Sequence, residues 1–349
     1  MFEESTVNLQ DQGFSWCRVF RSTLVACAGV LTFASATFAQ GPVRVEKIEY
    51  KGWKNALKLS NGDVELIATL DVGPRIVSYR LADGQNVLKE YADQQGKSGE
   101  STWQIRGGHR LWVAPEDIER TYATDNGPIS YEVETSGAVR FVQPADSHGI
   151  KKTMAVKLAP KGSEVTITHT IENAGKEATS LAPWALTVMS GGGVEIIPQP
   201  PHAPHPGSST GAKAADDFLP HFTLVLWPYF EFTDPRWTFG KDLILLRHMQ
   251  RGPTKIGLSN SAGWAGYVNN GTLFLKRFDW EKQATYPDRG VNYETFSNED
   301  MVEMESLGPL VKLAPGGAVE HVERWSLQGG VGAVRDEADA AALVSKWLK

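Results

Sequence analysis

The feature that most constrains this chain is a series of short segments in which apolar and polar residues alternate, with turn residues between them. Alternation with a period of two indicates strands with one buried face, and Asn-Gly or Ser-Gly between two such segments indicates a hairpin. The hairpins predicted in this way cover residues 56–69, 129–143, 153–175 and 255–278. Many strands at short spacing predict an all-β fold, built as an antiparallel sandwich or barrel.

Two stretches depart from this pattern. Residues 335–349 have a helical period, which predicts a short C-terminal helix. Residues 198–217 are rich in Pro, Gly and Ser, so we expect them to form a surface loop inserted into the β fold. The sequence therefore predicts a single β domain over residues 40–349, with a loop insertion at about 198–217.

The first 39 residues are interpreted as a secretory signal peptide. Two arginines precede an apolar run over residues 24–38, and small residues stand at the positions expected for cleavage after Ala39. The run is shorter than the roughly 20 apolar residues that a membrane span needs. We expect a periplasmic or secreted protein, with a lipoprotein signal ending at Cys27 as the less favoured alternative. The stretch before the two arginines is long and acidic for a signal peptide, which indicates that the start codon is placed too far upstream. Cleavage after Ala39 would remove both cysteines of the chain.

The charge balance argues against two classes of partner. The chain has 35 Lys and Arg against 41 Asp and Glu, a net charge of −6, and no basic run. Nucleic acids and anionic membranes attract basic patches, so neither is expected as a partner. The 11 tryptophans fit either a sandwich core or a surface that stacks on sugars.

The segment GGHRLW at residues 107–112 joins a glycine pair to charged and aromatic residues. Glycines in a strand permit a bend and a close backbone approach. Arg110 offers a planar fork that can hydrogen-bond vicinal hydroxyls, and Trp112 or Trp103 offers a flat apolar face. Adjacent strand residues point to opposite faces, so His109 shares a cleft with Arg110 only if a bulge turns it.

The segment MVEMES at residues 301–306 places two carboxylates on one face. Alternation puts Glu303 and Glu305 together, while the residues between them take the other face. Such side chains are often solvated. A carboxylate held on a strand in an aromatic cleft is, however, also placed to act as a general base, an effect of roughly 10²–10⁴-fold.

These motifs resemble those of aldose 1-epimerases, which belong to the galactose-mutarotase-like superfamily. The resemblance rests on GGHRLW, on PWALTVMSGGG from Pro183, on DPRW from Asp234, and on ESLGPL followed by HVERWSL. It extends over residues 43–328 and looks most like a bacterial branch of the superfamily without an assigned function. It implies a large antiparallel supersandwich, which agrees with the predicted hairpins.

The resemblance also implies roles for individual residues. Glu305 matches the general base that takes the proton from the anomeric hydroxyl, and Arg110 matches the arginine that binds sugar hydroxyls. Epimerases carry a general-acid histidine on a strand that corresponds to residues 181–192, which contain no histidine, so His109 is a candidate substitute. No metal or other cofactor is expected. The other residues expected to bind the sugar are Trp103, Trp112, Trp184, Arg236, Asp288 and Glu303.

Three classes of function remain open. The first is a carbohydrate enzyme with Glu305 as base, either an epimerase or a polysaccharide lyase. The second is a carbohydrate-binding protein without catalysis, which the missing histidine favours. The third is a structural envelope protein with a vestigial cleft. In the first two, a sugar or glycan is the partner, and Glu305 is expected in an open cleft beside Arg110. Burial of both residues in a closed ion pair would favour the third.

Overall fold

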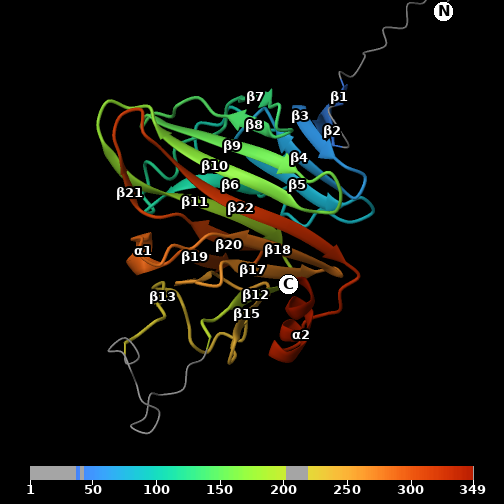
Figure 1. The fold of residues 1–349 in the computed structure, drawn as a ribbon, viewed down its shortest axis with the longest axis vertical. Helices are drawn as coiled ribbons and strands as arrows, with labels where there is room; N and C mark the ends of the chain where they lie inside the picture. The colour runs from blue at the N-terminus through green and yellow to red at the C-terminus, as the bar shows by residue number, and fades with distance from the viewer. Residues whose placement is uncertain (1–36, 40–42, 202–218, 349) are drawn as a thin grey trace, which may run out of the picture. The chain divides into compact units, whose positions relative to one another are not determined.

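The computed structural model of this chain describes residues 37–39, 43–201 and 219–348. These residues form two large antiparallel sheets and little helix, which confirms the predicted all-β class (Figure 1). Most of the predicted signal segment and most of the predicted loop at 198–217 lie outside the described residues. Thr37–Ala39 forms strand β1, which pairs with β2 (Arg44–Tyr50), and cleavage after Ala39 would remove it from the mature chain.

The first sheet has twelve strands, one of which, β21 (Val311–Leu313), pairs with β11 off the main path. The order along the main path is β1, β2, β3 (Trp53–Ser60), β4 (Val64–Thr69), β5 (Arg75–Leu81), β6 (His109–Ala114), β11 (Thr179–Ser190), β20 (Met301–Leu307), β19 (Tyr293–Ser297), β16 (Thr254–Leu258) and β13 (Leu224–Leu226).

The second sheet has ten strands. The order is β14 (Trp237–Phe239), β15 (Leu243–Arg247), β12 (Val194–Pro198), β17 (Trp264–Asn269), β18 (Thr272–Phe278), β22 (Ala318–Gly329), β10 (Val165–Asn173), β9 (Ile150–Leu158), β8 (Val139–Val142) and β7 (Ser130–Val133). Strands β9, β10 and β22 lie side by side in Figure 1. The four hairpin segments predicted from the sequence all form paired strands, the one at residues 56–69 in the first sheet and the other three pairs in the second.

Apolar side chains of the two sheets meet in one large core. Buried residues alternate with half-buried ones along β9 and β10, so one face of each strand packs inward and the other faces outward. The indole of Trp325 on β22 is fully buried there. It packs against Tyr79 of the first sheet at 5.8 Å and against Phe274 of the second sheet at 5.3 Å between ring centroids.

The central strands of the first sheet are covered on both faces. Every residue of β6 and of β20 is buried, although neighbouring residues point in opposite directions. The inner face packs on the second sheet. The outer face is covered by side chains from outside these strands, among them Trp103 and Tyr122. This outer face carries the candidate site.

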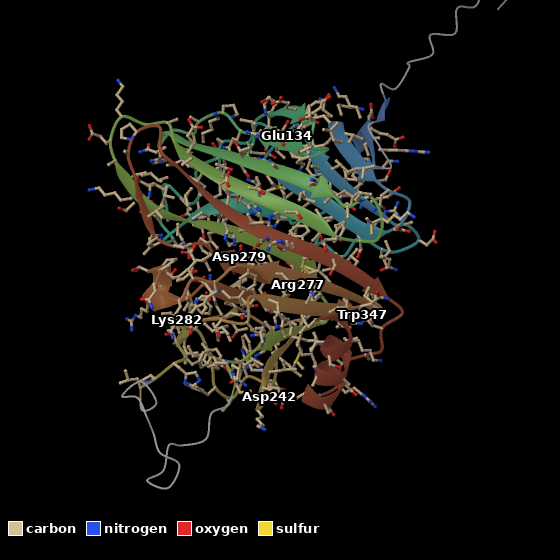
Figure 2. All side chains as sticks on the ribbon, in the orientation of Figure 1. Glu134, Asp242, Arg277, Asp279, Lys282 and Trp347 are labelled. Atoms are coloured by element: carbon tan, nitrogen blue, oxygen red, sulfur yellow. The ribbon has the colours of Figure 1, made fainter. Side chains whose placement is uncertain are left out.

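The C-terminal helix α2 (Glu337–Trp347) confirms the predicted helix and packs beside β15 (Figure 1). Its first residue, Glu337, accepts hydrogen bonds from the backbone of Asp242 at 2.6 Å and of Leu243 at 2.8 Å. At its other end, Arg277 donates to the carbonyl oxygen of Trp347 at 2.8 Å; Figure 2 labels Asp242, Arg277 and Trp347. A second helical segment, α1 (Pro287–Gly290), is a single kinked turn. In the described part of the chain no helix is long and apolar enough to cross a membrane.

Candidate functional site

A pocket of about 310 Å³ lies on the outer face of the first sheet, over five adjacent strands. Cross-strand register explains how it forms. Arg110 on β6 stands opposite Leu186 on β11, and Leu186 stands opposite Glu305 on β20. Because directly opposite residues share a face, Arg110 and Glu305 flank Leu186 on the same side of the sheet. The residues that line the pocket are Trp103, Ile105, Arg110, Trp112, Glu116, Tyr122, Trp184, Leu186, Tyr229, Lys255, Phe296, Asn298, Met301, Glu303 and Glu305.

One wall of the pocket is aromatic. Trp112 packs against Trp103 at 4.9 Å, against Tyr122 at 4.9 Å and against Trp184 at 5.4 Å between ring centroids. Tilted and edge-to-face contacts of this kind stabilise aromatic clusters and hold each ring in one orientation. The rings therefore give the pocket a rigid apolar surface.

Arg110 is held by one carboxylate and two indoles. Its Nη2 donates to Oε1 of Glu303 at 2.8 Å, and the guanidinium lies 4.2 Å from the ring centroid of Trp112 and 5.2 Å from that of Trp103. The side chain is only 2% exposed. Within the described residues, its Nε and Nη1 have no hydrogen-bond partner. Arg110 thus keeps donors that a ligand oxygen can use.

Glu305 is fully buried at the floor of the pocket. Its Oε2 accepts from the indole Nε1 of Trp184 at 2.9 Å and from Nζ of Lys255 at 3.1 Å. Its Oε1 has no partner among the described residues. Burial raises the pKa of this carboxyl, Lys255 opposes the rise, and the nearby Glu303 adds to it. A carboxylate with a raised pKa is a stronger base than a solvated one.

A second buried carboxylate lies behind Lys255. Glu294 on β19 stands opposite Glu305 and forms an ion pair with Nζ of Lys255 at 2.7 Å. Burial raises the pKa of Glu294 to about 8, with Lys255 opposing the rise and Glu305 adding to it. One ammonium faces both carboxyl groups, and the pKa values of Glu294 and Glu305 are both raised.

The pocket brings together six of the residues predicted from the sequence, and the shared face of the two glutamates follows the predicted alternation. These residues are Trp103, Arg110, Trp112, Trp184, Glu303 and Glu305. Trp184 comes from the segment in which epimerases carry the acid histidine, and here its indole bonds the predicted base.

The expectation that His109 joins Arg110 in the cleft is corrected by the structure. No bulge turns it, so His109 points from β6 toward the second sheet and is fully buried between the sheets. Its Nε2 lies 2.7 Å from Nε2 of His169, and its Nδ1 lies 2.9 Å from the hydroxyl of Thr187. Burial holds the pKa of His109 well below its ordinary value. His109 is therefore neutral and remote from the pocket.

The imidazoles between the sheets form a continuous hydrogen-bond chain. The carbonyl oxygen of His321 can only accept, so Nδ1 of His169 donates to it at 3.0 Å. Nε2 of His169 then accepts from His109, and Nδ1 of His109 accepts from Thr187. This assignment leaves each ring neutral and both of its nitrogens bonded.

His109, His169 and Glu323 are also the residue types that bind zinc, and their ligand atoms lie within 4.8 Å of one another. Glu323 is already engaged, however. It forms an ion pair with Lys276 at 2.7 Å and accepts from the indole of Trp325 at 2.8 Å. Both oxygens of Glu323 are thus bonded and the two imidazoles bond each other, so the group fits an internal hydrogen-bond network better than a metal centre.

Two other predicted residues lie outside the pocket. Arg236 is buried in an ion pair with Asp234 at 2.7 Å and borders a separate cavity of about 350 Å³. Asp288 lies in the α1 turn with a backbone φ of 47°. The expectation that both bind a sugar in this pocket is corrected, because neither of them lines it. Tyr229 borders both this cavity and the pocket.

Sequence reasoning missed the two charged residues beside Glu305. Every residue of the strand that carries Lys255 is buried, and all but one residue of the strand that carries Glu294 are buried. A signal was present, because the only charged side chain of a buried strand is costly to bury without a partner. The sequence did not reveal that the two strands are adjacent.

A larger cavity, of about 710 Å³, lies elsewhere. Loops line it at residues 62–63, 81–87, 269–272 and 329–330, and its charged residues are Asp63 and Asp83. It contains neither an aromatic ring nor a buried ionisable group. The smaller pocket is therefore the better candidate on chemical grounds.

Comparisons with known proteins support the fold. The structure is similar to a TPR-domain containing protein from Parabacteroides distasonis, with a TM-score of 0.53 and 17% identity over 82% of this chain, which spans about half (48%) of that protein. It is similar to the Slr1438 protein from Synechocystis, with a TM-score of 0.52 and 10% identity over 81% of this chain and 99% of that one. It is also similar to a putative mutarotase (YeaD) from Salmonella typhimurium, with a TM-score of 0.50 and 11% identity over 85% of this chain and 98% of that one.

At these identities the likeness shows the fold alone. No family model matches the chain, and no curated protein matches it. The chain has the galactose-mutarotase-like supersandwich fold that the sequence motifs implied.

Proposed function

We propose that this protein binds a neutral sugar in the pocket over β6, β11 and β20 and interconverts its anomers, with Glu305 as the base. The observation that carries the proposal is the unpartnered Oε1 of Glu305 in the same pocket as the unpartnered donors of Arg110. Buried polar atoms are nearly always hydrogen-bonded, so such a pair points to a polar ligand.

The lining of the pocket supports a sugar as that ligand. Rigid indoles offer flat apolar faces, and a few fixed polar groups provide orientation, which is the composition typical of small-molecule sites. The positive charges of Arg110 and Lys255 are balanced by Glu303 and Glu305, and Glu116 adds a further carboxylate. This pocket has no surplus of positive charge for an acidic ligand, which favours a neutral sugar.

The proposed chemistry is a reversible proton transfer. Oε1 of Glu305 takes the proton of the anomeric hydroxyl and a carbonyl forms. The bond between the anomeric carbon and the ring oxygen breaks, and the ring oxygen keeps its electrons and takes up a proton. Rotation and ring closure on the other face give the second anomer. Because Glu305 is fully buried, a side chain that covers it has to move before the hydroxyl reaches Oε1.

A second candidate function is sugar binding without catalysis. The observation that favours it is that no histidine stands among the described residues that line the pocket. In that case the sugar would contact the aromatic wall without reaching the floor of the pocket. The burial of Arg110 and Glu305 in ion pairs with Glu303 and Lys255 instead favours the third class, a structural protein.

One experiment separates the two functions. Saturation-transfer NMR against common aldoses, uronic acids and short glycans identifies ligands, and exchange spectroscopy then measures the interconversion of their anomers. We expect the wild type to accelerate exchange and Glu305→Gln to reduce the acceleration by at least about 100-fold with sugar binding retained. Glu49→Gln, an exposed change whose side chain is 68% accessible, is the matched control.

Binding without any exchange by the wild type would favour the non-catalytic function. A wild type that binds no sugar would contradict both.

A further inference from the structure

Lys255 lies at the centre of the charged cluster. Its Nζ is 3.1 Å from Oε2 of Glu305 and 2.7 Å from Oε2 of Glu294. The same atom lies 4.8 Å from the ring centroid of Trp184 and 4.7 Å from that of Trp227. Two carboxylates and two indoles therefore fix the position of the ammonium, and its side chain is 6% exposed while it still lines the pocket.

Few other groups in the pocket can give up a proton to a sugar. Arg110 does not deprotonate in proteins. Tyr122 donates its proton to Glu116 at 2.6 Å, so its hydroxyl is engaged. Tyr229 is 41% exposed. Of the ionisable side chains that line the pocket, Lys255 is the one that contacts Glu305.

We propose that Lys255 is the general acid of the anomer exchange, in place of the histidine that epimerases use. This inference rests on the proposed function. Glu305 takes the proton from the anomeric hydroxyl, whose O–H electrons form the carbonyl. The electrons of the breaking bond go to the ring oxygen, which takes a proton from Nζ of Lys255. Ring closure reverses both transfers, so no other reactant is consumed.

The short distance between acid and base suits this reaction. The anomeric hydroxyl and the ring oxygen are bonded to the same carbon, so the acid and the base have to reach two oxygens that lie close together. Nζ of Lys255 lies 3.1 Å from Oε2 of Glu305, the oxygen beside Oε1 on the same carboxylate, which meets that condition. A histidine on the opposite face of β6, such as His109, does not.

The two transfers also assist each other. Burial lowers the pKa of Lys255, but the carboxylates of Glu305 and Glu294 outweigh it and leave the pKa raised. When Glu305 becomes protonated, one of those two attractions is lost and the ammonium releases its proton more readily. The titratable groups that face Lys255 are Glu294 from β19, Glu305 from β20 and, across the pocket, Tyr229.

The test uses two substitutions at one position. Lys255→Arg keeps the positive charge between the carboxylates but cannot give up a proton at neutral pH. Lys255→Met removes both the charge and the proton. We expect both variants to bind the sugar and both to lose at least about 100-fold in exchange rate. Lys54→Met, a change at a lysine whose side chain is 73% exposed, is the matched control, and thermal melts confirm folding.

The outcomes are distinguishable. A wild type that exchanges anomers while Lys255→Arg does so at the same rate overturns the acid role and leaves the proposed function standing. A wild type that exchanges no sugar overturns the proposed function, and the acid role with it. If Lys255→Met fails to fold, Lys255→Arg alone decides, because it preserves the charge that the structure needs.

Discussion

Neighbouring residues on the central strands of the first sheet point to its two opposite faces. On β6, Arg110 lines the pocket on the outer face, whereas His109 beside it points between the two sheets. The same division applies on β20, where Glu305 faces the pocket and Ser306 bonds His321 between the sheets at 2.6 Å. Alternation predicted that neighbours separate in this way, and it placed Glu303 and Glu305 together.

Glu195 provides a prediction about stability and pH. It is fully buried on β12, where it accepts hydrogen bonds from Tyr293 and from Thr295 at 2.6 Å. Burial raises its pKa to about 8, while in the unfolded chain it titrates at about 4.3. Between these values the folded state binds more protons, so the free energy of unfolding falls as pH rises. The contribution is complete below the unfolded pKa and is lost as pH rises through about 8.

We therefore expect Glu195→Gln, which cannot ionise, to flatten this dependence. Urea denaturation of wild type and variant from pH 4.5 to 8.5 measures the free energy of unfolding at each pH. The largest difference expected between the two pH dependences is about 1.4 kcal/mol for each unit by which folding shifts the pKa of Glu195. Equal slopes for the two proteins would show that Glu195 is already ionised in the folded state.

At the scale of elements, the glycine pair before β6 positions Arg110. Gly107 and Gly108 have φ values of 74° and 69°, in the left-handed region that favours glycine. A Cβ on Gly108 would lie 2.2 Å from the carbonyl oxygen of Ile76, and one on Gly107 would lie 2.0 Å from that of Lys89. The close approach allows β6 to pair with β5.

We expect Gly108→Ala to reduce the free energy of unfolding by at least about 2 kcal/mol, because it combines a strained φ with a clash against backbone. Gly127→Ala, with open space around its Cβ, should change it by less than about 0.5 kcal/mol. Denaturation midpoints of the two variants give the comparison. A Gly108→Ala protein as stable as the control would mean that the backbone before β6 can shift at little cost in stability.

At the scale of the whole β domain, one buried lysine connects the two sheets. Lys276 of β18 is ion-paired with Glu323 of β22, and its Nζ also donates to the carbonyl oxygens of Ala185 at 3.2 Å and Met304 at 2.8 Å. The first two residues belong to the second sheet and the last two to the first sheet. This connection lies directly beneath the strands that carry the pocket.

Much of this architecture could be predicted, and the limit has a physical cause. Hairpins depend on local turns and alternation, so the strand pairs around Asn61 and Asn270 were readable from the sequence. The pairing of β20 with β19 and of β16 with β19 places Lys255 and Glu294 beside Glu305. The contact between β16 and β20 residues depends on sheet order, which local patterns do not encode. For that reason, the partner of Glu305 was missed.

A crystal structure of the protein with the best-binding neutral sugar tests the catalytic role of Glu305 directly. We expect the sugar in the pocket, its anomeric hydroxyl within hydrogen-bond distance of Oε1 of Glu305, its ring oxygen facing Nζ of Lys255, and a covering side chain displaced. A sugar bound only at another surface, or held against the aromatic wall with Glu305 still sealed beneath it, would contradict the catalytic role of Glu305.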